Sequence, residues 1–276
     1  MKEKSKVLKI ILYVVLIAYA ILTLYPFLWA LAASFKPLKE IVSGNPGLFP
    51  KHFTLANYQY ITGTSSLFTK WFMNSVIVSV IGTIVNLFLN TMAGYALARL
   101  NFPGRQKIYY AFLALMMVPA QVLLIPNYLI LMNLGMLDTF SSLILPAAIN
   151  IGNIFMMRQF FLSFPMDVEE AAQIDGLGRI ATFFRIVMPL ARPSIATQAI
   201  FVFMGFWNNF MQPMLYISTP KKYTLTLGLQ TFTSQATGVR WDHTMAASII
   251  SIVPIIILYI IFNGYFLQGV RMDGEK

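Results

Sequence analysis

The sequence of 276 residues contains no cysteine, which excludes a disulfide framework and any metal site built from thiolates. None of its glycines is followed by lysine, so the phosphate-binding GxxxxGK loop is also absent. The two histidines, His52 and His243, lie far apart, without the clustered ligands of a metal site. These absences predict that the chain holds no metal and does not itself bind ATP through such a loop.

Charged residues are also scarce, at 11% of the chain, whereas 58% of the residues are hydrophobic and the mean hydropathy is +0.69. This composition is typical of a membrane protein. Six apolar runs are long enough to cross a bilayer as helices, and their lack of alternation excludes the strands of a membrane barrel. We therefore predict an all-α, polytopic helical membrane protein. Its six runs lie near residues 10–33, 71–98, 108–132, 141–157, 194–218 and 245–267.

The distribution of charge predicts the topology of these spans. Most of the 20 Lys and Arg fall in the N-terminal tip, the short loop 99–107 and the segment 158–192. The positive-inside rule then favours both termini in the cytoplasm. The first apolar run is about twice the length of a signal-peptide core, so we interpret it as an uncleaved span rather than a cleaved signal. The expected regions are 1–34 with the first span, an external loop 35–70, a core of five spans 71–267 and a cytoplasmic tail 268–276.

A charged hairpin interrupts this apolar sequence at residues 163–192. Four of the ten acidic residues lie within nine positions, at Asp167, Glu169, Glu170 and Asp175. This density of charge excludes the hairpin from the bilayer, and Gly176 fits a left-handed cap at the end of its first helix. The apolar residues that follow, including Phe183 and Phe184, need a covering surface. Either the membrane or the chain's own bundle could supply it, and so could a separate protein.

The residues of this hairpin resemble the EAA signature of permease subunits in binding-protein-dependent ABC importers. Further likeness, to the sugar-importing branch and its maltose-type second permease, extends over essentially the whole chain. One departure is Leu177, because the family usually has alanine directly after the glycine. The matching segments are Glu170-Ala171-Ala172, Asp175-Gly176, Phe183, Pro189-Leu190, 25–29, 34–36, 53–58, 118–121, 207–210 and 268–270.

The resemblance implies a type I ABC importer permease fold and transport by alternating access. It also implies four partners: a second, non-identical permease, a dimer of ATPase subunits that bind ATP and Mg, an extracytoplasmic solute-binding protein, and a carbohydrate, in particular an oligosaccharide, as substrate. The chain itself would then be no enzyme and have no catalytic residues. The residues expected to couple it to the ATPase are Glu170, Ala171, Ala172, Asp175, Gly176, Phe183 and Pro189.

Amide side chains are the main polar groups of the predicted spans, which contain no Asp, Glu, Lys, Arg or His. This absence argues against an ion-coupled carrier, which generally needs ionisable groups in the membrane. A non-transporting membrane scaffold is the other alternative. Amides exchange hydrogen bonds with sugar hydroxyls and aromatic rings stack on sugars, although amides equally join helices to one another. The candidate pathway residues are Gln121, Trp207, Asn208, Asn209 and Gln212.

The external loop 219–243 resembles the segment that reaches toward the binding protein in maltose-type permeases. Lys221, Lys222 and Trp241 are the candidate contacts in this loop. Trp241 equally fits the belt of aromatic residues at a membrane surface.

Overall fold

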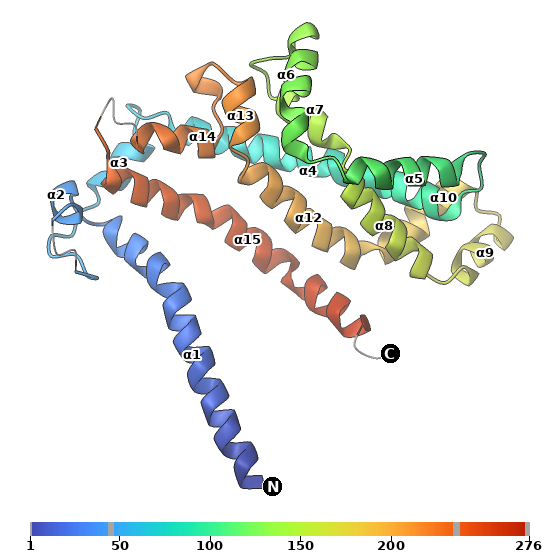
Figure 1. The fold of residues 1–276 in the computed structure, drawn as a ribbon, viewed down its shortest axis with the longest axis horizontal. Helices are drawn as coiled ribbons and strands as arrows, with labels where there is room; N and C mark the ends of the chain where they lie inside the picture. The colour runs from blue at the N-terminus through green and yellow to red at the C-terminus, as the bar shows by residue number, and fades with distance from the viewer. Residues whose placement is uncertain (1, 44–46, 234–237, 274–276) are drawn as a thin grey trace. The chain divides into compact units, whose positions relative to one another are not determined.

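The computed structural model describes residues 2–43, 47–233 and 238–273, which form helices and turns and contain no strand (Figure 1). The predicted all-α fold is confirmed. The chain divides into two compact units, Met1–Thr69 with Gly228–Val253, and Lys70–Leu227 with Pro254–Lys276. A part of each predicted region lies outside the described residues: 1 in the first, 44–46 in the external loop, 234–237 in the core of five spans and 274–276 in the tail.

The first unit combines the N-terminal helix and the loop that follows it with the segment Gly228–Val253. Within it, the buried amide of Asn57 donates hydrogen bonds to the carbonyls of Ser34 and Lys36, at 2.9 Å each. Tyr60 stacks on His243 at a ring distance of 4.0 Å. The unit contains α1 (Lys2–Ala33), α2 (Leu38–Ile41), α3 (Ala56–Thr62), the 3-10 turn Gln230–Thr233 and the first half of α15 (Trp241–Asp273).

The second unit holds most of the candidate site residues. Its longest helix is α4 (Phe68–Arg99), whose first two residues belong to the other unit. The remaining helices are α5 (Arg105–Met116), α6 (Leu124–Asn133), α7 (Ser141–Ala148), α8 (Ile151–Ser163), α9 (Asp167–Ile174), α10 (Arg179–Thr182), α11 (Met188–Leu190), α12 (Arg192–Trp207), α13 (Met211–Tyr216) and, up to Leu227, α14 (Leu225–Leu229). The unit also contains the 3-10 turns Ala120–Leu123 and Pro220–Lys222, the π-helical turn Phe183–Val187 and the second half of α15, from Pro254.

Three helices are individually long and apolar enough to cross a membrane, and three bent pairs raise this number to six if each pair is one span. The straight candidates lie in α1, α4 and α15. The pair 105–116 and 120–133 bends by 95°, next to Pro119, and the pair 141–148 and 151–163 bends by 42°. The third pair, 179–190 with 192–207, bends by 76°. Pro254 does not have this effect, because α15 continues through it.

Small and polar residues make up much of the buried face in the first two thirds of α4. Ser75, Ser79, Gly82 and Asn86 recur at intervals of three and four along it, whereas large apolar residues such as Ile84 face outward. Because lipid is as apolar as a leucine side chain, burial of apolar residues does not drive helices together in a membrane. Helices associate there through close packing and polar contacts instead. α4 therefore forms the spine against which its neighbours pack.

The break between α7 and α8 is closed by amide side chains of α4. Ile149 and Asn150 are extended, which leaves backbone groups on both sides without helical partners. Asn90 donates to the carbonyl of Ala148 at 3.1 Å and accepts a hydrogen bond from the backbone N–H of Asn150 at 3.0 Å. Asn86 donates to the carbonyl of Ala147 at 2.7 Å. Three backbone groups at the break are thus paired with side chains of α4.

Candidate functional sites

The first helix of the hairpin, α9, buries one face and exposes the other. Glu169 and Ala172, three residues apart, are buried, whereas Glu170, Ala171 and Asp175 are exposed. The acidic residues of the first turn lie where the helix dipole favours negative charge. The exposed face therefore carries three of the residues that the family resemblance assigns to coupling.

The end of α9 is a Schellman cap centred on Gly176, which confirms the predicted left-handed cap. Gly176 has φ +83°, and its N–H donates to the carbonyl of Gln173 at 3.0 Å. The N–H of Leu177 donates to the carbonyl of Ala172 at 2.9 Å. A hydrophobic residue commonly follows the glycine of this motif. This geometry gives a physical reason for leucine at position 177.

Glu169 is held by two side chains from the end of α4. Its carboxylate accepts a hydrogen bond from the Tyr95 hydroxyl at 2.9 Å and forms an ion pair with Arg99, with 3.1 Å between Oε1 and Nε. Arg99 also donates to the carbonyl of Phe164, between α8 and α9. The sequence does not single out these residues, because two adjacent glutamates give no sign of which faces inward.

The second half of the hairpin, α10 to α11, packs against the same end of α4. Phe183 and Val187 are buried in a cluster with Tyr95, Met157 and Phe161. The chain's own bundle therefore covers these two residues. Phe184 remains exposed, and Pro189 is partly buried.

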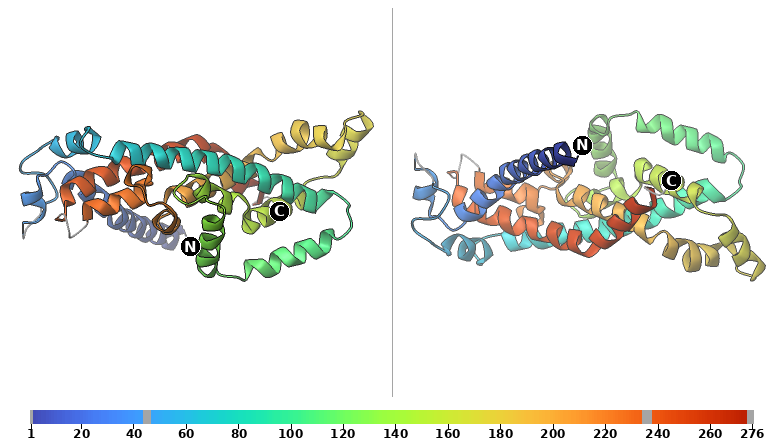
Figure 2. Two further views of the ribbon diagram at one scale, coloured as in Figure 1. Left: turned by 90° about the horizontal axis from the view of Figure 1, so that it is seen from above. Right: turned by 90° about the horizontal axis from the view of Figure 1, so that it is seen from below.

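The uncovered part of the hairpin combines apolar and charged residues. Ile174 and Ile180 are 87% and 77% exposed, and they lie near Glu170 and Asp175 in the sequence. Figure 2 shows the hairpin at the end of the unit where α4 finishes. This end of the hairpin therefore exposes two isoleucines beside acidic residues.

A cavity of about 270 Å³ lies between α4, α7, α8 and α12. Its lining contains amides and aromatic rings but no charged residue; it comprises Asn86, Ala147, Asn150, Asn153, Phe201, Val202, Gly205, Phe206 and Asn209. Phe201 and Gly205 are exposed, so the cavity opens at the surface of this chain. Such a surface can offer hydrogen bonds and apolar contact to an uncharged polar ligand.

The structure distributes the candidate pathway residues over several environments. Asn209 lines the cavity, and its side chain bonds to Gln212 at 2.6 Å. Trp207 is buried, with its ring stacked on Phe203. Asn208 is exposed at the end of α12, and Gln121 is exposed in the turn between α5 and α6. Asn86, Asn150 and Asn153 join Asn209 in the cavity, although nothing in the sequence distinguishes them from the other amides of the spans.

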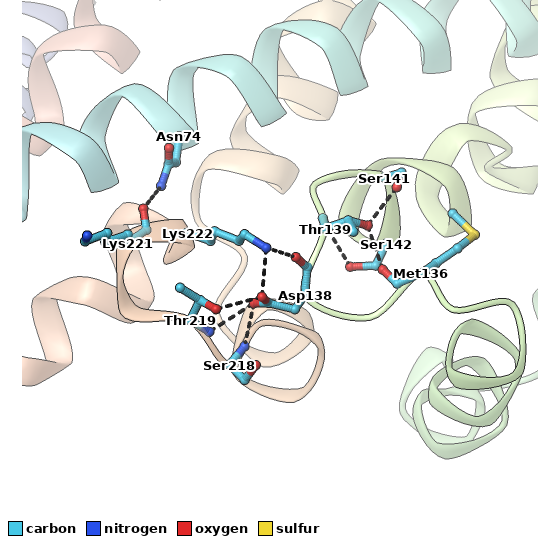
Figure 3. Close-up of polar contacts among 10 residues, drawn as sticks. All are labelled: Asn74, Met136, Asp138, Thr139, Ser141, Ser142, Ser218, Thr219, Lys221 and Lys222. Carbon is cyan, nitrogen blue, oxygen red and sulfur yellow. Dashed lines mark hydrogen bonds and ion pairs between the residues drawn. The ribbon is translucent and has the colours of Figure 1, made fainter.

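Asp138 fastens the loop after α6 to the loop after α13 (Figure 3). Its carboxylate accepts hydrogen bonds from the N–H groups of Ser218 and Thr219, at 3.1 and 2.9 Å, and from the Thr219 hydroxyl at 2.7 Å. Lys222 Nζ lies 2.8 Å from Oδ2. These donors, led by Lys222, hold the pKa of Asp138 well below its usual range. Asp138 also has φ +57°, which aspartate tolerates better than most residues.

The three candidate contacts to the binding protein differ in their surroundings. Lys222 is engaged with Asp138, although its side chain is 45% exposed. Lys221 is exposed, and its backbone carbonyl accepts a hydrogen bond from Asn74 at 3.0 Å (Figure 3). Trp241, in the other unit, is the exposed first residue of α15.

Replacement of Asp138 by alanine is expected to destabilise the second unit by about 1 kcal/mol at pH 7, a value reduced for the exposure of Lys222. Because the folded pKa is depressed, the stabilisation is present above the unfolded pKa of about 3.9 and is lost as the pH falls through the folded value. Unfolding of purified protein in detergent at pH 7 and pH 3 measures the difference. Lys222→Ala should act in the same direction, and an equal loss in the control Lys221→Ala would contradict the assignment.

The described residues contain no group of three or more His, Cys, Asp or Glu side chains arranged to hold a metal ion.

Residues 90–272 match the family model described as the binding-protein-dependent transport system inner membrane component. The chain is 34% identical over 279 residues to an arabinooligosaccharides transport system permease protein of Halalkalibacterium halodurans, with 100% of both chains covered. It is 38% identical to a diacetylchitobiose uptake system permease protein of Streptomyces coelicolor, over 91% of this chain and 83% of the relative.

A solved structure supports the same relationship. The chain superposes with a TM-score of 0.86 on a chain of a bacterial ABC transporter involved in the import of the acidic polysaccharide alginate. The two are 25% identical, and the match covers 95% of this chain and 98% of the other.

Proposed function

Because this chain belongs to the inner membrane components of binding-protein-dependent transport systems, we propose that it moves an uncharged oligosaccharide through the cavity between α4, α7, α8 and α12. The chain is a multi-pass membrane permease subunit of an ABC importer and not an enzyme. Its relatives give no support to an ion-coupled carrier or to a non-transporting scaffold.

The cavity carries the proposal for the substrate. Four asparagines and two phenylalanines line it without any charge, which suits neutral hydroxyl groups and the apolar faces of sugar rings. Its volume lies just below the range of about 300–1,000 Å³ for small-molecule pockets, so it suits part of an oligosaccharide chain. The two relatives named above carry neutral sugars in their names. An acidic polysaccharide such as alginate would instead favour basic side chains.

The exposed rim at Phe201 and Gly205 supports a pathway shared with a second, non-identical permease, which would close the cavity from the other side. The proposed assembly further contains an ATPase dimer that binds ATP and Mg, and a solute-binding protein that delivers the sugar. The charge distribution supports cytoplasmic termini. With that orientation the hairpin faces the ATPase, and Lys221, Lys222 and Trp241 face the solute-binding protein.

In the assembly, the hairpin is the element that docks on the ATPase. Its coupling residues are Glu170, Ala171, Ala172, Asp175, Gly176, Phe183 and Pro189. Within this set, the exposed Glu170, Ala171 and Asp175 are the proposed direct contacts. Ala172, Phe183 and Gly176 shape the hairpin from within, through burial or through the cap. Closure of the ATPase dimer would then displace the hairpin and switch the bent helices between outward and inward openings.

Replacement of Gly205 by leucine is expected to lower oligosaccharide uptake about five- to tenfold, because a side chain there reduces the space and binding surface of the cavity. A Cβ atom at this position meets no atom within 4 Å, so a side chain can begin here without displacing the backbone of a neighbouring helix. Removal of a glycine from α12 also favours the helix by about 1 kcal/mol. The expected loss of uptake is therefore not a loss of folding.

Uptake is measured with radiolabelled sugar in proteoliposomes that contain all transporter subunits. Gly205→Ala is the matched control, because it removes the glycine but leaves most of the cavity open. Normal uptake by Gly205→Leu would refute the proposed pathway. Competition between a neutral arabinooligosaccharide and an acidic oligogalacturonate tests the charge preference, and equal competition would refute it.

A further inference from the structure

Tyr95 donates a hydrogen bond to the Glu169 carboxylate and Arg99 forms an ion pair with it, both from a single face of α4. They are four residues apart, and this spacing places side chains next to each other on a helix. Each oxygen of Glu169 has its own partner, Oε2 the Tyr95 hydroxyl and Oε1 the Arg99 Nε. The contact thus fixes both the position and the rotation of the first hairpin helix relative to α4.

The cluster is buried, with 11% of the Glu169 side chain and 7% of the Arg99 side chain exposed. A buried ion pair contributes little net stability, because desolvation offsets the attraction between the charges. Removal of one partner is nevertheless costly, because the other charge is then buried without a counter-charge. The pair therefore resists separation. These properties suit a rigid joint better than they suit a stabilising contact.

Tyr95 also connects the other elements around this joint. Its ring packs on Phe161 of α8 at 5.5 Å and on Phe183 of the second hairpin segment at 4.9 Å. The Arg99 guanidinium reaches the carbonyl of Phe164, where α8 leads into the hairpin. The segment that enters the hairpin, at Phe164, and the segment that leaves it, at Phe183, therefore both contact the C-terminal end of α4.

The opposite direction along α4 leads to the cavity. Asn86 lies nine residues before Tyr95, or about 14 Å along the helix axis, and it lines the cavity. The same helix thus contacts the hairpin at its end and the proposed pathway near its middle. A displacement of the hairpin that moves α4 also moves one wall of the cavity.

We propose that Glu169, Arg99 and Tyr95 form a joint that transmits movement of the hairpin into α4, with Glu169 as the positioning residue. This inference rests on the proposed function of the chain as a permease driven by a separate ATPase. The exposed Glu170 contacts the ATPase in this arrangement, whereas the buried Glu169 carries the resulting movement inward. The two adjacent glutamates therefore have separate roles.

The test compares oligosaccharide uptake with ATP hydrolysis in proteoliposomes that contain the complete transporter. Glu169→Gln keeps the size of the side chain but removes its charge, and we expect the sugar imported per ATP to fall about tenfold, the usual order for loss of a hydrogen bond to a charged group. Tyr95→Phe keeps the ring contacts with Phe161 and Phe183, and we expect a smaller fall in the same ratio. Asp167→Asn is the matched control, because Asp167 is an exposed acid on the same helix.

The ratio separates this joint from a merely structural contact. A wild-type ratio in Glu169→Gln, or a proportional fall in uptake and hydrolysis, would overturn the inference. If Glu169→Gln fails to assemble, Tyr95→Phe decides the matter, since a wild-type ratio there refutes the joint. The exchanged pair Glu169→Arg with Arg99→Glu should recover part of the lost coupling. Failure of the wild-type assembly to import any sugar on ATP addition would instead refute the proposed function itself.

Discussion

Replacement of Gly176 by valine is expected to lower sugar uptake about 10- to 100-fold, which corresponds to a backbone strain of about 1–3 kcal/mol at this position. Gly176 has φ +83°, and a β-branched residue is strongly disfavoured there. The strain opens the Schellman cap and frees Leu177 from its bond to Ala172. The exposed face of α9 then loses the orientation that docking on the ATPase requires.

The effect of this substitution is conformational rather than steric, because a Cβ at Gly176 meets no atom within 4 Å. Asparagine tolerates a left-handed conformation, so Gly176→Asn is the matched control and should retain most of the uptake. Uptake in proteoliposomes and co-purification of the ATPase report the two effects. A Gly176→Val variant with normal uptake, or a Gly176→Asn variant with as large a loss as Gly176→Val, would contradict the role of the cap.

Because the chain lacks cysteine, a cysteine introduced at Ile174 provides a unique crosslinking site to the ATPase.

Replacement of Gly94 by leucine is expected to remove most of the folded permease. A Cβ at this position would lie 2.7 Å from the Met157 Cβ, 3.0 Å from the Arg158 nitrogen and 3.1 Å from the Ile154 carbonyl oxygen. Two of these atoms are backbone, so α4 and α8 must move apart to admit any side chain. Overpacking of this kind typically costs about 1–3 kcal/mol, and a rigid backbone on the opposite side favours the upper end.

The yield of monodisperse protein in detergent and its thermal unfolding measure this effect. Gly205→Leu is the matched control, because it introduces the same side chain into a helix of the same unit at a position where a Cβ meets no atom within 4 Å. The two variants should differ clearly: Gly94→Leu loses the fold, whereas Gly205→Leu keeps the fold and has lower uptake. A Gly94→Leu variant with wild-type yield and unfolding temperature would contradict the close approach of α4 and α8.

Long uncharged runs were sufficient to predict the helical membrane fold, because few other structures satisfy backbone groups in lipid. The bends were less accessible to prediction. Pro119 lies at a sharp break, whereas Pro254 lies within a continuous helix, and the difference depends on packing that a single sequence does not contain. The apolar runs therefore reveal how many segments can cross, but not which of them bend.

The candidate sites divide in a similar way. Gly176 was predictable because its cap depends on local backbone geometry. Glu169 was not, because its burial depends on Tyr95 and Arg99, which lie 74 and 70 positions earlier in the chain. Trp207 has the residue type of a sugar-binding ring, yet its partners Phe203 and Phe72 enclose it. The acidic pair 169–170 does not show which of the two glutamates faces inward.

The side-chain amide of Asn90 supplies hydrogen-bond partners that the helix lacks at the break between α7 and α8. It donates on one side of the gap and accepts on the other, as a peptide group would. The chain at 149–150 can therefore change direction in the bilayer, because asparagine side chains of α4 bond to the backbone groups that the break leaves without helical partners. The articulation belongs as much to α4 as to the segment that bends.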